Sequence, residues 1–324
     1  MFSSSTILVY ILVATQAIAT PVCDPSKSGS LGCGVSNQLY KRALSGPAVK
    51  ATTASSLAKY MQYSAAVYCD SVTSKSEWSC GTLCQGNTAG TEIKATFSNN
   101  GQGIGIVAVD KSSGTTIIAF RGSTNMDDWG TNLDIALEPV TWLTKPPGKK
   151  LPEIPSDMKV HTGFQKNYLG VRSKVQAAIK VATDQYPNNK VVFTGHSLGG
   201  ALASIAAFDF IYSNTPVNSN KVSVFTYGMP RIGNDKFAAW FTKIPFGYTF
   251  RVTCQNDPVP HLPPQLFGYL HFDQEFGISD DGVTHTCSNV GNTGETSNCQ
   301  EADYLPNFDA HKNGYYFSSG CITK

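Results

Sequence analysis

The apolar and polar positions of this chain alternate between two kinds of segment. Short runs of β-branched and aromatic residues predict buried strands at Gly103–Val109, Thr115–Phe120, Val191–Thr194, Val222–Tyr227 and Tyr248–Thr253. Apolar residues at helical spacing predict helices at Ser56–Tyr68, Asn167–Tyr186, Ser197–Tyr212 and Asn234–Phe241. Strands that alternate with helices favour an α/β fold, with a mostly parallel central sheet and helices on both faces.

The N-terminal residues have a different character. The apolar run Thr6–Ala14 is too short to span a bilayer and precedes Ala17-Ile18-Ala19, a pattern that signal peptidase accepts. We therefore expect a signal peptide at 1–19, the alternative being a buried N-terminal strand, and a secreted, extracellular protein. Residues 20–42 are polar and end in the dibasic pair Lys41-Arg42, which predicts a pro-segment and a zymogen; a plain surface loop is the alternative. The α/β domain is then expected at 43–324.

Composition narrows the class of partner. The chain has 25 Lys and Arg against 23 Asp and Glu, and no long run carries one sign. This balance argues against nucleic acid or an anionic membrane surface as a partner. We expect no stable membrane insertion and a monomer.

The nine cysteines suit an oxidising compartment, whereas they form no paired C-x-x-C units of the kind that bind zinc. Cys80 with Cys84, and Cys287 with Cys299, could each close a short loop, and a Cys69–Cys321 bond would tie the ends of the domain together. Cys23 and Cys33 would then pair within the pro-segment, which leaves Cys254 as a thiol. Connectivity is not determined by sequence alone. We expect no metal and no cofactor.

The strongest chemical motif is Gly195-His196-Ser197-Leu198-Gly199, with a predicted strand before it and an Ala-rich helix after it. A sharp strand-to-helix turn holds a serine above the sheet edge with its hydroxyl exposed, and side chains at the flanking glycines would collide with the neighbouring elements. The motif in this context predicts that Ser197 is the nucleophile of a serine hydrolase.

A serine nucleophile needs a histidine base and a carboxylate that orients it, in the chain order Ser, acid, His for this architecture. The histidines after Ser197 are His261, His271, His285 and His311. Asp257 follows a predicted strand end, where such sites assemble. However, Asn256-Asp257-Pro258 fits a simple turn nearly as well.

From Ser56 to Cys321 the chain resembles the fungal class 3 lipases and their feruloyl esterase relatives. Besides the Gly195–Ala201 motif, the resemblance is carried by Phe120-Arg-Gly-Ser123, His161-Thr-Gly-Phe164, Tyr227–Asn234, Asn256–Pro264 and Asp309-Ala-His311. It implies an α/β-hydrolase fold, with Asp257 as the triad acid and His311 as the base. It also implies the disulfides Cys69–Cys321, Cys80–Cys84 and Cys287–Cys299. His161, His271 and His285 are then expected to be structural, and His261 to shape the Leu-Pro-Pro turn at the wall of the site. His196 lies in the motif, but its side chain need not point at the substrate.

The same resemblance bears on the oxyanion hole and on a lid. One donor is expected from the backbone N–H of Leu198, which follows the nucleophile. The resemblance places the second at Ser123, although an ordinary turn after the strand would look the same. In the next segment Met126, Trp129 and Leu133 share one face of a short helix, which the resembling lipases use as a lid over the site. Gly130 departs from their pattern by lacking a larger apolar side chain, and a static surface helix is the alternative.

These observations predict a triacylglycerol lipase that acts on acylglycerols at a lipid–water interface through a Ser-His-Asp acyl-enzyme. The alternatives within the class are a feruloyl esterase of plant cell walls and a mono- or diacylglycerol lipase. An acyltransferase would share the mechanism. A non-catalytic binding protein on the same fold is disfavoured, because every position of the triad and of the oxyanion hole holds a competent residue.

Overall fold

The computed structural model describes residues 46–124, 135–213, 218–254, 256–279, 282–287 and 307–316, and the single residues 295, 299 and 321. By its contacts the chain divides into two units, Met1–Arg42 and Ala43–Lys324, and every described residue lies in the second. The predicted signal peptide and pro-segment therefore lie outside the described residues, as does the predicted lid with Met126, Trp129 and Leu133.

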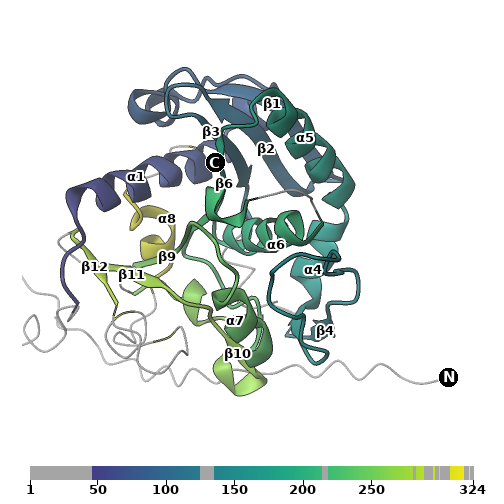
Figure 1. Ribbon diagram of the computed structural model, residues 1–324. Helices are drawn as coiled ribbons and strands as arrows, with labels where there is room; N and C mark the ends of the chain where they lie inside the picture. The colour runs from purple at the N-terminus through teal and green to yellow at the C-terminus, as the bar shows by residue number, and fades with distance from the viewer. Residues whose placement is uncertain are drawn as a thin grey trace, which may run out of the picture. The chain divides into compact units, whose positions relative to one another are not determined.

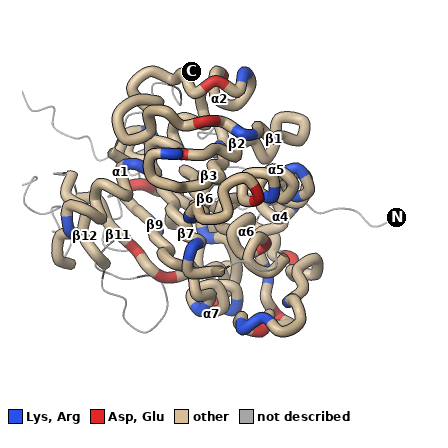
Figure 2. The backbone as a smooth tube through the Cα atoms, turned by 45° about the horizontal axis from the view of Figure 1, so that its top comes forward, with Lys and Arg blue, Asp and Glu red and all other residues tan. Residues whose placement is uncertain are grey.

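An eight-stranded sheet forms the centre of this unit, in the order β1-β2-β3-β6-β7-β9-β11-β12, and Figure 2 shows these strands in sequence across the molecule. The strands are β1 Glu92–Asn99, β2 Gln102–Asp110, β3 Thr115–Phe120, β6 Lys190–His196, β7 Val222–Tyr227, β9 Tyr248–Cys254, β11 Glu275–Ile278 and β12 Thr284–Thr286. Strands β3 to β11 pair in parallel, whereas β1, β2 and β12 join antiparallel at the two edges. The predicted mostly parallel sheet is confirmed.

The helices are α1 Ala51–Ala66, α2 Asp70–Thr73, α4 Thr162–Leu169, α5 Arg172–Gln185, α6 Leu198–Ser213, α7 Asp235–Thr242 and α8 Phe308–Asn313 (Figure 1). A smaller sheet has the order β10-β8-β5-β4. Its strands are β4 Leu137–Pro139, β5 Lys159–His161, β8 Gly233–Asn234 and β10 Tyr269–Leu270. Short 3₁₀ turns lie at Gly81–Cys84, Gly86–Thr88, Ser219–Lys221, Val259–His261 and Gln265–Phe267.

Alternate side chains of each central strand enter different hydrophobic cores, one on each face of the sheet. Ile117 and Ala119 of β3 pack in the core that contains Leu57 and Met61 of α1. Their neighbours Ile118 and Phe120 pack in the core that contains residues of α4, α5, α6 and α7. Because successive side chains on a strand point to opposite faces, helices cover both faces of the sheet, as predicted.

Helix α6 is enclosed by its neighbours, since every residue from Gly199 to Tyr212 is buried. Its one charged residue, Asp209, is paired with Arg172, and most of its other residues are apolar and require such enclosure. The N-terminus of α6 is therefore held firmly beneath the end of β6, which fixes the position of the turn between them.

Two differences from the predicted elements have physical causes. The helix predicted over 167–186 is two helices, α4 and α5, separated at Gly170. The chain departs from regular helical geometry at Val171, whose φ is −117° and ψ is −4°. Strand β1 was not predicted, because most of its residues are only half-buried and give no clear apolar run.

The three expected disulfides are present: Cys69–Cys321, Cys80–Cys84 and Cys287–Cys299. The first joins residues 252 positions apart and ties the end of α1 to the C-terminal segment. Among the described cysteines Cys254 forms no disulfide, and Cys23 and Cys33 lie outside the described residues.

Among the described helices, none has both the length and the apolar character needed to cross a bilayer. Lys and Arg are interspersed with Asp and Glu along the described backbone (Figure 2).

Candidate active site

Ser197 lies at a strained turn between β6 and α6. Its φ of 59° is in the left-handed region, which costs a non-glycine residue energy and is found where structure serves function. Two backbone hydrogen bonds hold the turn: Ser197 N donates to Tyr227 O at 2.8 Å, and Gly200 N donates to Ser197 O at 2.9 Å. The surrounding structure thus fixes a conformation that the sequence would otherwise avoid.

The glycines that flank Ser197 are required by close approach. A Cβ at Gly195 would lie 2.2 Å from the carbonyl of Gly199, and a Cβ at Gly199 would lie 2.2 Å from Phe120 O. Both distances are far below van der Waals contact. The spacing of glycines in the motif therefore follows from how tightly α6 packs against β6 and β3.

His311 and Asp257 meet although 54 positions separate them. His311 Nδ1 is 2.9 Å from Oδ1 and 2.8 Å from Oδ2 of Asp257, and both side chains are fully buried. Asp257 lies in the turn after β9, and its Oδ1 accepts a further bond from Val259 N at 2.8 Å. His311 lies on α8, which is capped by Asn307, whose side chain accepts from Asp309 N.

The other ring nitrogen of His311 is available. Nε2 is buried and has no hydrogen-bond partner among the described residues. The His311 ring lies 4.5 Å, between centroids, from the ring of His196, the residue before Ser197. A base whose Nδ1 is bound to a carboxylate and whose Nε2 is open can take a proton from a serine hydroxyl.

Two residues that the sequence did not single out hold the Asp257–His311 pair. The hydroxyl of Tyr315 donates a short hydrogen bond to Asp257 Oδ2. Burial, reinforced by the charge of Asp257, raises the pKa of Tyr315 well above its usual value, so the phenol keeps its proton as a donor. Gly228 lies against both partners, since a Cβ there would be 2.8 Å from Asp257 Oδ2 and 2.9 Å from His311 Nδ1. Gly228 also has a positive φ of 56°.

Ser123 and Leu198 line one recess. The recess holds about 500 Å³ of empty space, open to solvent, and its walls also include Arg121, Gly122 and Leu202. Arg121 N donates to Ile104 O at 2.8 Å, which fixes the start of the loop after β3. Leu198 is the first residue of α6, where backbone N–H groups point outward without helical partners.

The remaining histidines make structural contacts. His161 Nδ1 accepts from Gly163 N at 3.0 Å and so caps α4. His271 Nε2 bonds to Pro260 O at 2.8 Å, and His285 Nδ1 bonds to Gly46 O at 2.9 Å. His261 lies in the loop after Asp257, and its backbone carbonyl accepts a hydrogen bond from Arg231. These contacts agree with structural roles for these four histidines.

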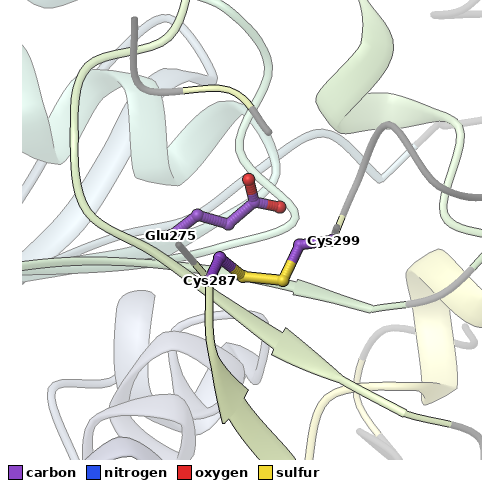
Figure 3. A group of neighbouring side chains, drawn as sticks. All are labelled: Glu275, Cys287 and Cys299. Atoms are coloured by element: carbon purple, nitrogen blue, oxygen red, sulfur yellow. A yellow bond between two sulfur atoms is a disulfide. The ribbon is translucent and has the colours of Figure 1, made fainter. Parts of the chain in front are cut away.

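One group of metal-ligating residue types lies apart from Ser197 and consists of Glu275, Cys287 and Cys299 (Figure 3). Its two sulfur atoms are bonded to each other. The Glu275 carboxylate accepts from Thr253 Oγ1 at 2.7 Å and from Arg251 Nη2 at 3.1 Å. With sulfur and oxygen already engaged, the group is a structural contact and offers a metal no thiolate.

Comparison with known proteins places these features in a family. Residues 117–267 match the family described as Lipase (class 3). The chain is 32% identical to a secreted mono- and diacylglycerol lipase of Fusarium solani, over 78% of this chain and 77% of the relative. It is 33% identical to a lipase of Rhizomucor miehei, over 75% of this chain and 63% of the relative.

Solved structures agree. The propeptide complex of the Rhizomucor miehei lipase superposes with a TM-score of 0.74 and 30% identity, covering 85% of this chain and 84% of that one. A triacylglycerol lipase whose catalytic centre is described as a serine protease triad superposes with a TM-score of 0.74 and 31% identity. The match covers 86% of this chain and 99% of that one.

Proposed function

Because the chain belongs to the class 3 lipase family, we propose that it is a secreted lipase that hydrolyses acylglycerol esters with Ser197, His311 and Asp257 as its triad. The observation that carries the proposal is the buried His311, whose Nδ1 binds both oxygens of Asp257 while its Nε2 stays open. Ser197 is held in a left-handed turn next to the residue whose ring packs on His311. The three groups lie on separate segments, and the fold brings His311 and Asp257 into contact next to the residue that precedes Ser197.

Acylation begins with the Ser197 hydroxyl. Its oxygen attacks the ester carbonyl carbon while His311 Nε2 accepts the hydroxyl proton. The Asp257 carboxylate keeps the Nδ1 proton on the far side of the ring and stabilises the imidazolium that forms. His311 then returns the proton to the leaving alcohol, and the acyl group remains on Ser197.

Deacylation repeats the sequence with water. His311 Nε2 accepts a proton from water, whose oxygen attacks the acyl-enzyme, and the fatty acid leaves as Ser197 regains its proton. In both steps the former carbonyl oxygen becomes negative, and the backbone N–H groups of Leu198 and Ser123 are the proposed donors to it. The place of Leu198 as the first residue of α6, directly after Ser197, supports this assignment. Each step uses side chains, backbone and water of the site.

Triacylglycerol is the proposed main substrate, with mono- and diacylglycerols as the nearest alternative. Relatives named lipase and a relative named mono- and diacylglycerol lipase are about equally similar to this chain. A glyceride preference therefore has to be measured.

A lid is proposed over residues 124–133. Its support is the amphipathic spacing of Met126, Trp129 and Leu133, and its place directly after Ser123. Such a segment would cover the site in water and turn its apolar face to oil. An activity that rises once a substrate exceeds its solubility would support the lid, and an activity that depends only on dissolved ester would contradict it.

Secretion with removal of a pro-segment is proposed for the N-terminal part. The division of the chain between Arg42 and Ala43 supports this boundary. The relative named as secreted supports export, and the propeptide complex solved for a similar lipase supports a pro-segment. N-terminal sequencing of the protein from culture medium should find Ala43 as its first residue. A first residue of Thr20 would contradict removal of a pro-segment.

The experiment that tests the function compares three substrates on the purified protein. Emulsified triolein, emulsified monoolein and methyl ferulate are each assayed with the wild type and with Ser197→Ala. Release from the oleins that disappears in Ser197→Ala is the expected result, and their ratio assigns the glyceride preference. Release from methyl ferulate alone would move the protein to the feruloyl esterases, and Ser197-independent release would contradict the triad.

A further inference from the structure

Two buried side chains outside the triad connect its parts. Tyr68 lies just after α1 and is 5% exposed, and His196, the residue before Ser197, is fully buried. The Tyr68 hydroxyl is 3.1 Å from His196 Nδ1. His196 Nε2 is 2.9 Å from the backbone oxygen of His311. Gly122, which precedes Ser123, packs against the same Tyr68 hydroxyl, since a Cβ at Gly122 would lie 2.2 Å from it.

The direction of each hydrogen bond can be worked out. Burial and the nearby His311 hold the pKa of His196 well below its usual value, so the ring is neutral and has one donor and one acceptor nitrogen. The carbonyl of His311 can only accept, so Nε2 carries the proton. Nδ1 is then the acceptor, and the Tyr68 hydroxyl donates to it.

The two donors therefore run one way, from the Tyr68 hydroxyl to His196 Nδ1 and from His196 Nε2 to the His311 carbonyl. Hydrogen bonds in such a chain polarise and strengthen one another in a buried setting. Burial also raises the pKa of Tyr68, which keeps the phenol protonated.

Both ends of this series of hydrogen bonds contact parts of the proposed catalytic site. The last four carbonyls of a helix have no helical donor, and His311 lies within that stretch of the six-residue α8. At the other end, a Cβ at Gly122 would lie 2.2 Å from the Tyr68 hydroxyl and 2.7 Å from His196 O, so the loop is pressed directly against the pair.

We propose that Tyr68 and His196 are positioning residues. They fix the loop after β3, which carries Ser123, and the proposed base His311 in position relative to Ser197. This inference rests on the proposed function, because it assigns a role within the same catalytic site. Neither side chain takes part in the proposed proton transfers, although the His196 ring packs against that of His311. Their effect is on geometry, where a small displacement of a catalytic group lowers the rate far more than it lowers substrate affinity.

Tyr68→Phe tests the role, since it removes the hydroxyl and keeps the ring. We expect kcat per titrated active site to fall about tenfold on p-nitrophenyl butyrate, with KM changed less than about twofold. Tyr63→Phe is the matched control, because Tyr63 lies on α1, is fully buried and loses one hydrogen bond, that to Thr91 Oγ1 at 2.7 Å. The control should lose stability and keep kcat.

The histidine is tested by a pair of variants. His196→Leu removes the donor to the His311 carbonyl, whereas His196→Gln can still present an amide N–H to it and should recover part of kcat. Ring ¹⁵N NMR of the wild type should show His196 as the Nε2–H form, with no titration between about pH 5 and pH 9.

The outcomes separate this inference from the proposed function. An active wild type whose Tyr68→Phe and His196→Leu variants keep kcat, or lose no more than Tyr63→Phe, overturns the positioning role alone. A Nδ1–H form of His196 does the same, because it reverses the chain of donors. A wild type that hydrolyses no ester overturns the proposed function and this role with it.

Discussion

The Nδ1 atom of His311 lies 2.9 and 2.8 Å from the two carboxylate oxygens of Asp257, in a site where both side chains are fully buried. This contact fixes the tautomer of the ring, because a carboxylate can accept only from an N–H. Nε2 is then a lone-pair acceptor, which is the state that a general base requires.

Asp257→Asn should therefore impair catalysis without unfolding the protein. The amide can donate to Nδ1 and stabilise the opposite tautomer, so we expect kcat to fall by about 10⁴ with little change in KM. Asp309→Asn is the control, since Asp309 is an exposed carboxylate on the same helix as His311. Steady-state kinetics on p-nitrophenyl butyrate check both, and an Asp257→Asn variant within tenfold of wild type would contradict the assignment of the acid.

Gly228→Ala should distort the same pair. The added methyl would lie 2.8 Å from Asp257 Oδ2 and 2.9 Å from His311 Nδ1, closer than such contacts allow. We expect about a 100-fold loss of kcat in a folded protein. Gly268→Ala separates backbone strain from this contact, because Gly268 also has positive φ but nothing lies within 4 Å of its Cβ position. It should lose stability alone, and equal losses of activity in both variants would count against the proposed contact.

Tyr315→Phe should have a smaller effect. Removal of the hydroxyl takes one donor from Asp257 Oδ2 and leaves the hydrogen bonds from His311 Nδ1 and Val259 N in place. We expect kcat to fall about tenfold or less. Tyr316→Phe is the neighbouring control, because its hydroxyl bonds Thr284 Oγ1 at 2.6 Å and does not contact Asp257 in the described structure. Comparison of kcat with the melting temperature of each variant distinguishes a lost orientation from a lost packing contact.

The buried carboxyl of Asp110 is expected to make part of the free energy of unfolding depend on pH in the acidic range. Burial raises its pKa, but hydrogen bonds from Lys59, Ser112 and Ser113 outweigh burial and lower the pKa from 3.8 to about 2. A carboxyl whose pKa is lower in the folded state stabilises above its unfolded pKa, and that contribution is lost as the pH falls towards the folded pKa. The window is therefore between 3.8 and about 2.

Asp110→Asn should consequently melt below wild type at pH 7, by an amount that corresponds to about 1–2 kcal/mol. The difference should shrink as the pH falls through that window. Asp184→Asn removes an exposed ion pair with Lys180 and should change the melting temperature little at any pH. A difference between Asp110→Asn and wild type that stays constant from pH 7 to pH 2 would refute the linkage.

The sequence predicts central strands better than the edges of the sheet. The bounds of β3 and β7 match the predicted Thr115–Phe120 and Val222–Tyr227, because both strands are buried on both faces and read as continuous apolar runs. Strand β1 has only one fully buried residue, Phe97, so its apolar signal is weak. The break between α4 and α5 at Gly170 and Val171 falls within a segment whose apolar residues keep a helical spacing, so the pattern does not reveal it.

Within the site, the sequence close to the proposed nucleophile specifies its turn, whereas the proposed acid and base come from distant parts of the chain. The turn at Ser197 is specified by glycines within two residues of it, so the motif alone predicts it. Asp257 and His311 meet across 54 positions, and residue spacing could not choose between a catalytic aspartate and a turn-forming one. The contacts of Tyr68, His196 and Tyr315 depend on which side chains the fold sets opposite one another, and only the structure reveals them.

The most direct measurement of the central claim is the site of covalent labelling by diethyl p-nitrophenyl phosphate, which phosphorylates an activated serine hydroxyl. Peptide mass spectrometry should find one adduct per molecule, on Ser197, with esterase activity lost in proportion to labelling and no adduct in Ser197→Ala. Labelling of another residue in step with the loss of activity, or ester hydrolysis retained by Ser197→Ala, would contradict the account.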